Sequence, residues 1–169
     1  MTTPTSPLTV EETILQVIAH TMQIRREHEA KMKARRRHPE GDPRNLLVTS
    51  ADAFNDDDLE EMMNGPGDPR DHLLTALSDT DVRKVEVLVY AGRLRNLSLP
   101  QAAKNVRREG KDTTVSHLVG SMGNVLDELL LVGWAKVIKE RGTVGLDDWD
   151  PDAQVEEDAE EDDEDEDYE

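Results

Sequence analysis

The chain has 169 residues, of which 36% are hydrophobic and 3% aromatic, and it contains no cysteine. The absence of cysteine excludes disulfides and thiolate metal sites, and no run approaches the ~18 apolar residues that a membrane span needs. The N-terminal sequence lacks the basic and apolar stretches of a signal peptide. We therefore expect a soluble, cytoplasmic protein.

The formal net charge of −18 is concentrated at the C-terminal end of the chain. From Asp147 onward there are sixteen acidic residues and no Lys or Arg, which leaves 22 acids against 20 bases, a net charge of −2, in residues 1–146. A segment of this composition cannot bury enough apolar surface to fold, and its charges repel one another. Residues 147–169 are therefore predicted to be a disordered acidic tail whose deletion leaves the folded domain intact. Residues 1–8 are also predicted to be disordered.

The first predicted helix covers residues 9–37. Thr9 and Glu12 form a capping box, which satisfies unpaired N–H groups at a helix start, and apolar residues follow at three- and four-residue intervals. The apolar face ends near Met22, so the second half of this helix is expected to project from the body. The helix is expected to end before Pro39.

Residues 38–70 are predicted to be an irregular linker rich in Gly and Pro. Within it, residues 46–48 are apolar and expected to pack onto the domain, and residues 56–63 are a candidate short helix. At its end, Asp68 is a good N-cap and Pro69 suits the first position of the next helix.

Residues 71–141 are predicted to form the core helices. Ser78 with Asp81 begins a helix that reaches Gly92; its residues 85–90 are rich in β-branched side chains and are a candidate strand instead. Helix is favoured because the caps fit and no partner strand is evident. Ser98 with Gln101 forms a second capping box, for a helix that ends at Gly110.

Two further helical segments complete the predicted core. Asp112 is expected to cap a short turn of helix before Gly120. The segment 122–142 is the most apolar part of the chain and is apolar nearly all round, so we expect it to be the central helix. The predicted fold is all-α: a small bundle of four to six helices, spanning residues 9–141, with a disordered acidic C-terminal tail.

A family resemblance is carried by residues 73–138. This region contains an apolar helix that closes in Ala91-Gly92-Arg93, then Thr114 to Gly120, and finally Leu126, Leu130 and Gly133. It resembles bacterial domain-of-unknown-function family 3775, although His117 stands where that family tends to have Tyr and the acidic tail is extra. The resemblance implies a helical fold in a bacterial protein and no assigned activity.

A basic stretch lies near the N-terminal end of the chain, in residues 25–37, with a net charge of +5. On a helix Arg26, Lys33 and Arg37 share one stripe, which is suited to non-specific contact with a phosphate backbone. No aromatic residue is interleaved to stack on bases, and a solvated helix end is the plainer interpretation. The candidate anion or nucleic-acid contacts are Arg25, Arg26, Lys31, Lys33, Arg35, Arg36 and Arg37.

The acidic tail has three interpretations that composition leaves open. It keeps the protein soluble, it masks the basic stretch of its own chain, or it binds a partner. The candidate polyanion consists of Glu156, Glu157, Asp158, Glu160, Glu161, Asp162, Asp163, Glu164, Asp165, Glu166, Asp167 and Glu169.

Other chemistries have little support in the sequence. The segment 148–159 resembles a calcium loop but has Ala153 where the turn needs Gly and Ala159 where the bidentate Glu belongs. The five histidines show no metal spacing, and no Gly-rich phosphate loop is present. We therefore expect no cofactor, no metal and no catalytic residue.

These observations predict a non-catalytic protein, structural or regulatory, that acts through protein–protein interaction. The alternative is a nucleic-acid-associated protein that uses the basic helix end, with the acidic tail as an autoinhibitory mimic of a polyanion. A protein partner, a possible nucleic-acid partner through residues 25–37 and no membrane are expected, and the oligomeric state is left open.

Overall fold

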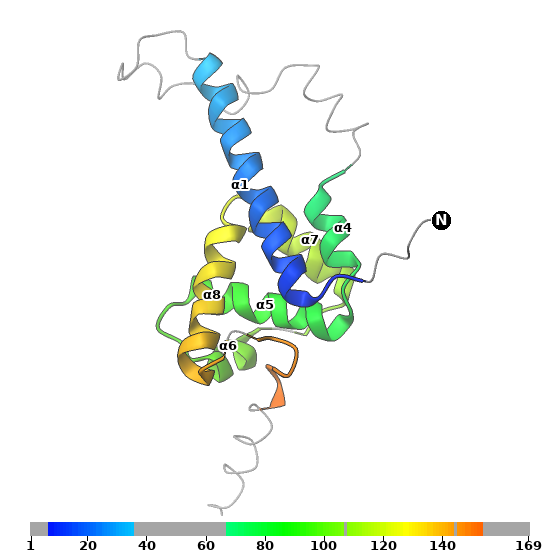
Figure 1. Ribbon diagram of the computed structural model, residues 1–169, viewed down its shortest axis with the longest axis vertical. Coiled ribbons are helices and arrows are strands. Elements are labelled where there is room, and N and C mark those ends of the chain that lie inside the picture. Colours follow the sequence, from blue (N-terminus) through cyan, green and yellow to red (C-terminus); the bar gives the residue numbers. More distant parts are fainter. Residues whose placement is uncertain (1–6, 36–66, 107, 144, 154–169) are drawn as a thin grey trace, which may run out of the picture.

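The computed structural model describes residues 7–35, 67–106, 108–143 and 145–153 (Figure 1). Within these ranges the chain forms six α-helices and no strand, which confirms the all-α prediction. The helices are α1 (Val10–Arg35), α4 (Pro69–Thr75), α5 (Asp79–Arg93), α6 (Leu99–Asn105), α7 (Lys111–Ser121) and α8 (Leu126–Arg141). The predictions made for residues 1–6, 38–66 and 154–169 fall outside the described residues.

Most of the predicted helix starts are present as hydrogen-bonded caps. The Thr9 hydroxyl accepts from the backbone N–H of Glu12 at 3.2 Å, and the Glu12 carboxylate accepts from the N–H of Thr9 at 2.9 Å. Asp68 caps α4 and Ser78 caps α5. Ser98 closes the predicted capping box on α6. Residues 85–90 lie inside α5, so the strand alternative for them is wrong.

Three helix ends differ from the prediction. The helix that begins after Ser98 ends at Asn105, well before Gly110, because Val106 adopts an extended backbone and Arg83 takes up the terminal carbonyls. Asp112 lies in the first turn of α7, after an N-cap at Gly110 that has no side-chain bond. The last helix starts at Leu126, four residues later than expected, and ends at Gly142 in the left-handed conformation.

The central helix of the bundle is α5, and the prediction that the last helix would be central is wrong. Side chains on all sides of α5 are buried, among them Val85, Val87 and Leu88, each with 0% exposure, because α8, α6 and α7 pack around it. The closest helix contact is with α8. A β-carbon at Gly92 would lie 2.9 Å from the Cα of Leu129, and one at Gly133 would lie 2.9 Å from the Cα of Leu88, so both positions need glycine.

α4 is held to the body by the buried cation Arg70, which is 5% exposed. Its guanidinium donates to the hydroxyl of Thr21 on α1, to the carbonyl of Gly123 and to the carboxylate of Asp68. Burial alone would raise the pKa of Asp68, but the hydrogen bonds and charge of Arg70 outweigh it and hold that pKa below its usual value. This set of contacts ties the start of α4 to the neighbouring helices.

No described helix is by itself both long and apolar enough to cross a membrane. Only α7 and α8 taken together meet the length and composition requirement, and they are bent by 115° relative to each other.

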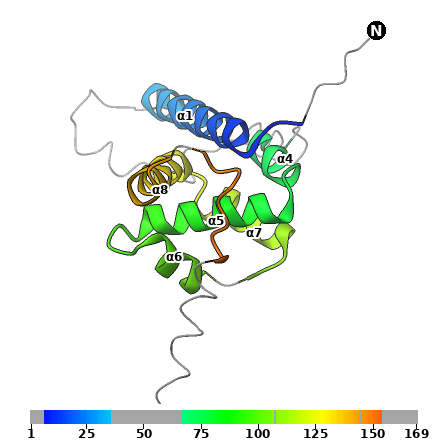
Figure 2. The same cartoon turned by 60° about the horizontal axis from the view of Figure 1, so that its bottom comes forward.

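The residues that follow α8 form part of the folded body. Residues 145–153, here called the C-terminal strap, cross α5 (Figure 2). Leu146 is 0% exposed and Trp149 is 2% exposed, and the Lys84 ammonium on α5 donates to the carbonyl of Asp147 at 3.0 Å. The prediction that the unfolded tail starts at residue 147 is therefore wrong. The composition of this segment did not indicate that it packs on α5, because the buried residues Trp149 and Pro151 alternate with acidic residues.

The strap also changes the expected result of truncation. Ending the chain after Ala153 should leave the free energy of unfolding within about 0.5 kcal/mol of the full-length value. Ending it after Leu146 removes the buried indole of Trp149 and should lower that free energy by about 3–5 kcal/mol. Urea unfolding of the two truncated chains beside the full-length protein measures both values. Equal midpoints for the two truncations would contradict the docked strap.

Candidate interaction surface

Arg25 joins the middle of α1 to the start of α8. Its guanidinium forms an ion pair with Asp127, whose side chain is only 5% exposed. It also donates to the Glu128 carboxylate at 3.1 Å and to the carbonyl of Asn124 at 3.0 Å. Arg25 was predicted to be a candidate anion contact, but its donors are used inside the fold, so it acts as an anchor for α1.

α1 and α8 run antiparallel. Arg25, in the second half of α1, meets the first turn of α8, and Glu11, in the first turn of α1, accepts a hydrogen bond from the N–H of Leu146, just beyond the end of α8. Both helices rise by the same amount per residue. Counting from the contact between Arg25 and Glu128 therefore places Met22 level with Leu131, and Leu15 level with Ile138.

Beyond Arg25, α1 leaves the body as a basic arm, defined as residues 26–37, of which the structure describes residues 26–35 (Figure 1). Residues 26–34 are exposed except Met32, which is half-buried, so the predicted projection is confirmed. The described part of the arm is about 15 Å long at the rise of an α-helix. Its net charge over residues 26–37 is +4.

The structure places the predicted basic residues differently along this arm. Arg26, Lys31 and Lys33 are exposed on the helix. Arg35 is the last helical residue, and its side chain, like Arg36 and Arg37, falls outside the described residues. Of the predicted contacts with described side chains, three therefore lie on the projecting arm, and Arg25 lies in the interface at its base.

Four large exposed hydrophobic side chains lie beside the contact between α1 and α8. Leu15 is 54% exposed, Met22 40%, Leu131 51% and Ile138 43%. Each helix contributes two of them, seven residues apart and thus on one face. Met22 lies one turn before Arg25, and Leu131 one turn after Asp127, so both flank the seam that the ion pair closes. We call these four residues the apolar seam.

The seam and the basic arm follow one line along α1. Leu15, Met22, Arg26 and Lys33 are spaced by seven, four and seven residues, which keeps them on one stripe of the helix. The surface therefore changes from apolar to cationic along α1, from the middle of the body to the tip of the arm. Scattered single hydrophobic residues are common on protein surfaces, whereas exposed hydrophobic residues gathered on one face are a feature of interaction sites.

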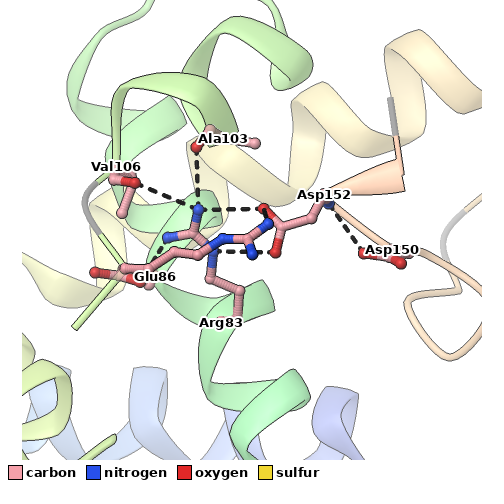
Figure 3. A network of polar contacts seen from close by, with 7 residues as sticks. Arg83, Glu86, Ala103, Val106, Asp150 and Asp152 are labelled. Carbon is pink, nitrogen blue, oxygen red and sulfur yellow. Dashed lines mark hydrogen bonds and ion pairs between the residues drawn. The ribbon is translucent and has the colours of Figure 1, made fainter. Parts of the chain in front are cut away.

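A second polar cluster surrounds Arg83 on α5 (Figure 3). Its guanidinium donates to the carbonyls of Ala103 and Val106 at the end of α6 and pairs with Glu86 and Asp152. Burial lowers the pKa of Arg83, but its acidic partners outweigh that effect and raise it. The Asp150 carboxylate accepts from the N–H of Asp152. Both residues belong to the segment that resembles a calcium loop in the sequence, and both have structural partners: Asp150 within the strap and Asp152 on α5.

A pocket of about 310 Å³ lies between α5, α6 and α7. Its lining includes the ionisable groups of Glu86, Arg93 and His117, but no Ser, Thr or Cys. Burial raises the pKa of Glu86, although Arg83 at 2.9 Å opposes the shift. Tyr90 and Glu109 also line the pocket, and Glu86 is already paired with Arg83, so the lining indicates no particular reaction class. Among the described residues, no group of three or more metal-ligating side chains comes together.

Comparisons with known proteins give no match to a family model, to a curated protein or to a solved structure. The resemblance to family 3775 therefore stays a prediction, and the surface must be interpreted from its own chemistry.

Proposed function

We propose that this chain is a non-catalytic interaction protein whose helical body docks a protein partner through the α1/α8 face, while its charged ends tune the binding. The observation that carries this proposal is the apolar seam, in which four large hydrophobic side chains are 40–54% exposed on two packed helices. Burying such side chains against a partner is favourable by roughly 25 cal/mol per Å². A cytoplasmic location is part of the same proposal.

The basic arm supports a contribution from charge to this binding. Arg26 and Lys33 continue the stripe that holds Leu15 and Met22, so a partner that covers the seam also meets the first cations of the arm. Exposed charges at the edge of an interface mainly raise the association rate and select the partner. We assign affinity to the seam and selectivity to the arm.

Site-specific photo-crosslinking tests the docking face. A photoreactive residue in place of Leu131 should form adducts of discrete mass in cells that make the protein, and these adducts should disappear when Leu15→Glu is added. The same residue in place of Thr113, an exposed position on α7, is the matched control and should give none. Equal labelling from positions 131 and 113, or labelling at 131 that Leu15→Glu leaves unchanged, would contradict the proposal.

A second candidate function is nucleic-acid association, which the exposed cations of the basic arm favour. If the arm neutralises about four phosphates, affinity for duplex DNA should fall roughly 100-fold between ~50 and ~200 mM salt. Electrophoretic mobility shift with a chain ending after Ala153 measures this dependence.

The control for this experiment distinguishes binding through the arm from binding through the net charge of the whole protein. Arg26→Glu with Lys33→Glu should abolish the shift, whereas Arg95→Glu with Lys104→Glu, which makes the same charge change at exposed positions of the body, should preserve it. No shift at low salt by the tail-less chain would remove this candidate.

A further inference from the structure

We propose that the partner of the apolar seam is a second copy of this chain, bound antiparallel and related by a two-fold axis. This inference rests on the proposed function, because it names the partner of the same face. The axis lies in the plane of contact and perpendicular to α1 and α8. It places α1 against α1 of the partner copy, and α8 against α8, as in an antiparallel four-helix arrangement.

The spacing of the seam fits this symmetry. Both pairs span seven residues, and the midpoint of Leu15 and Met22 lies level with the midpoint of Leu131 and Ile138 in the register set by Arg25 and Glu128. Two-fold pairing therefore sets Leu15 against Met22 of the other copy, and Leu131 against Ile138, with no apolar group left over. An isologous interface requires such self-complementarity, because the same patch must serve as both partners.

Charges at the two ends of each helix fit the same pairing. On α1, Glu11 and Arg26 are equally distant from the centre of the stripe, so each meets the other across the axis. On α8, Glu128 and Arg141 are related in the same way. Glu11 and Glu128 each also accept a hydrogen bond within their own chain, from the N–H of Leu146 and from Arg25, and a carboxylate can accept more than one. Antiparallel pairing sets these carboxylates opposite Arg26 and Arg141 of the other copy, which favours this arrangement over one that brings like charges together.

The two ends of the molecule extend this complementarity. The basic arm projects from one end of the body, and the strap ends near the opposite end (Figure 1). A contact within one chain between the arm and residues 154–169, which follow the strap in sequence, would have to span the body. In the antiparallel pair, the arm of one copy (+4) instead reaches toward the acidic end of the other, whose final fourteen residues carry twelve carboxylates.

Sedimentation equilibrium over a wide concentration range tests the pairing. A face about two helices wide lies at the small end of specific interfaces, so we expect a monomer–dimer equilibrium with Kd on the order of 10 µM at ~0.1 M salt. Leu131→Glu should raise Kd at least about tenfold, because it places carboxylates in the seam. Val125→Glu is the matched control: Val125 is 42% exposed at the start of α8 but off the seam, and the same charge change there should leave Kd within about twofold.

Two further measurements distinguish a lost interface from a misfolded variant and test the contribution of charge. Leu131 is half-exposed, so circular dichroism and urea unfolding should show that the Leu131→Glu variant folds. Leu15→Glu, on the other helix, should raise Kd as Leu131→Glu does. Ending the chain after Ala153 should raise Kd about three- to tenfold at ~0.1 M salt, and the difference should vanish near ~1 M salt, where the screening length falls to about 3 Å.

Each result decides the proposal. A monomer at all concentrations up to ~1 mM, or a dimer that Leu131→Glu leaves intact, would overturn it. A dimer whose Kd is the same with and without residues 154–169 would overturn the antiparallel arrangement. A strictly monomeric chain that still gives Leu131-specific adducts with a different protein would contradict this inference while leaving the proposed function in place.

Discussion

The surface described here depends on one ion pair, between the partly exposed Arg25 and the buried Asp127. Asp127 lies in the first turn of α8 with its side chain 5% exposed, and a carboxylate buried to that extent needs a charged partner. Arg25 supplies that partner from α1 and also takes the nearby carbonyl of Asn124. Together with the Glu11 contact at the other end of the helix pair, it fixes the direction and register of α1 on α8. The seam and the base of the arm follow from that register.

The other cations of the body serve a related purpose at helix ends. Carbonyls at helix ends and in the turns between helices have no partner within a helix, and lysine side chains bond to several of them here. Lys111 donates to the carbonyl of Leu77 between α4 and α5, and Lys136 donates to those of Leu94 and Leu97 between α5 and α6. Burial lowers the pKa of Lys136, with Glu140 opposing the shift. Arg83 does the same at the end of α6. Much of the positive charge of the body is therefore used to hold helices together, whereas Arg26 and Lys33 on the arm are exposed.

Local features of the fold could be predicted from the sequence, because a cap is made by residues two or three apart. Thr9, Asp68, Ser78 and Ser98 all cap helices in the structure. The errors involve partners far away in the chain. α6 ends early because of Arg83, 20 residues before Ala103, and the strap docks on α5, about 65 residues earlier in sequence. Periodicity within a window carries no information about such contacts.

The candidate surface was only partly predictable for the same reason. The exposed end of α1 followed from its loss of apolar residues after Met22. The seam did not, because Leu131 and Ile138 belong to a helix that is apolar nearly all round and was expected to be central. Their seven-residue spacing, matched by Leu15 and Met22, was the available signal. It becomes informative only once Asp127 and Arg25 are known to pair.

The antiparallel register of α1 on α8 is the central claim, and a cysteine-free chain allows a direct measurement of it. Cysteine pairs at 22 with 131, and at 15 with 138, should react within one chain with a bifunctional thiol reagent that spans the ~10 Å between packed helix axes. The crossed pair, 22 with 138, lies about 10 Å further apart along the helices and should not react. Rapid intramolecular crosslinking of both level pairs and not of the crossed pair is the predicted result. Equal rates for the level and crossed pairs would contradict the register and, with it, the existence of the seam.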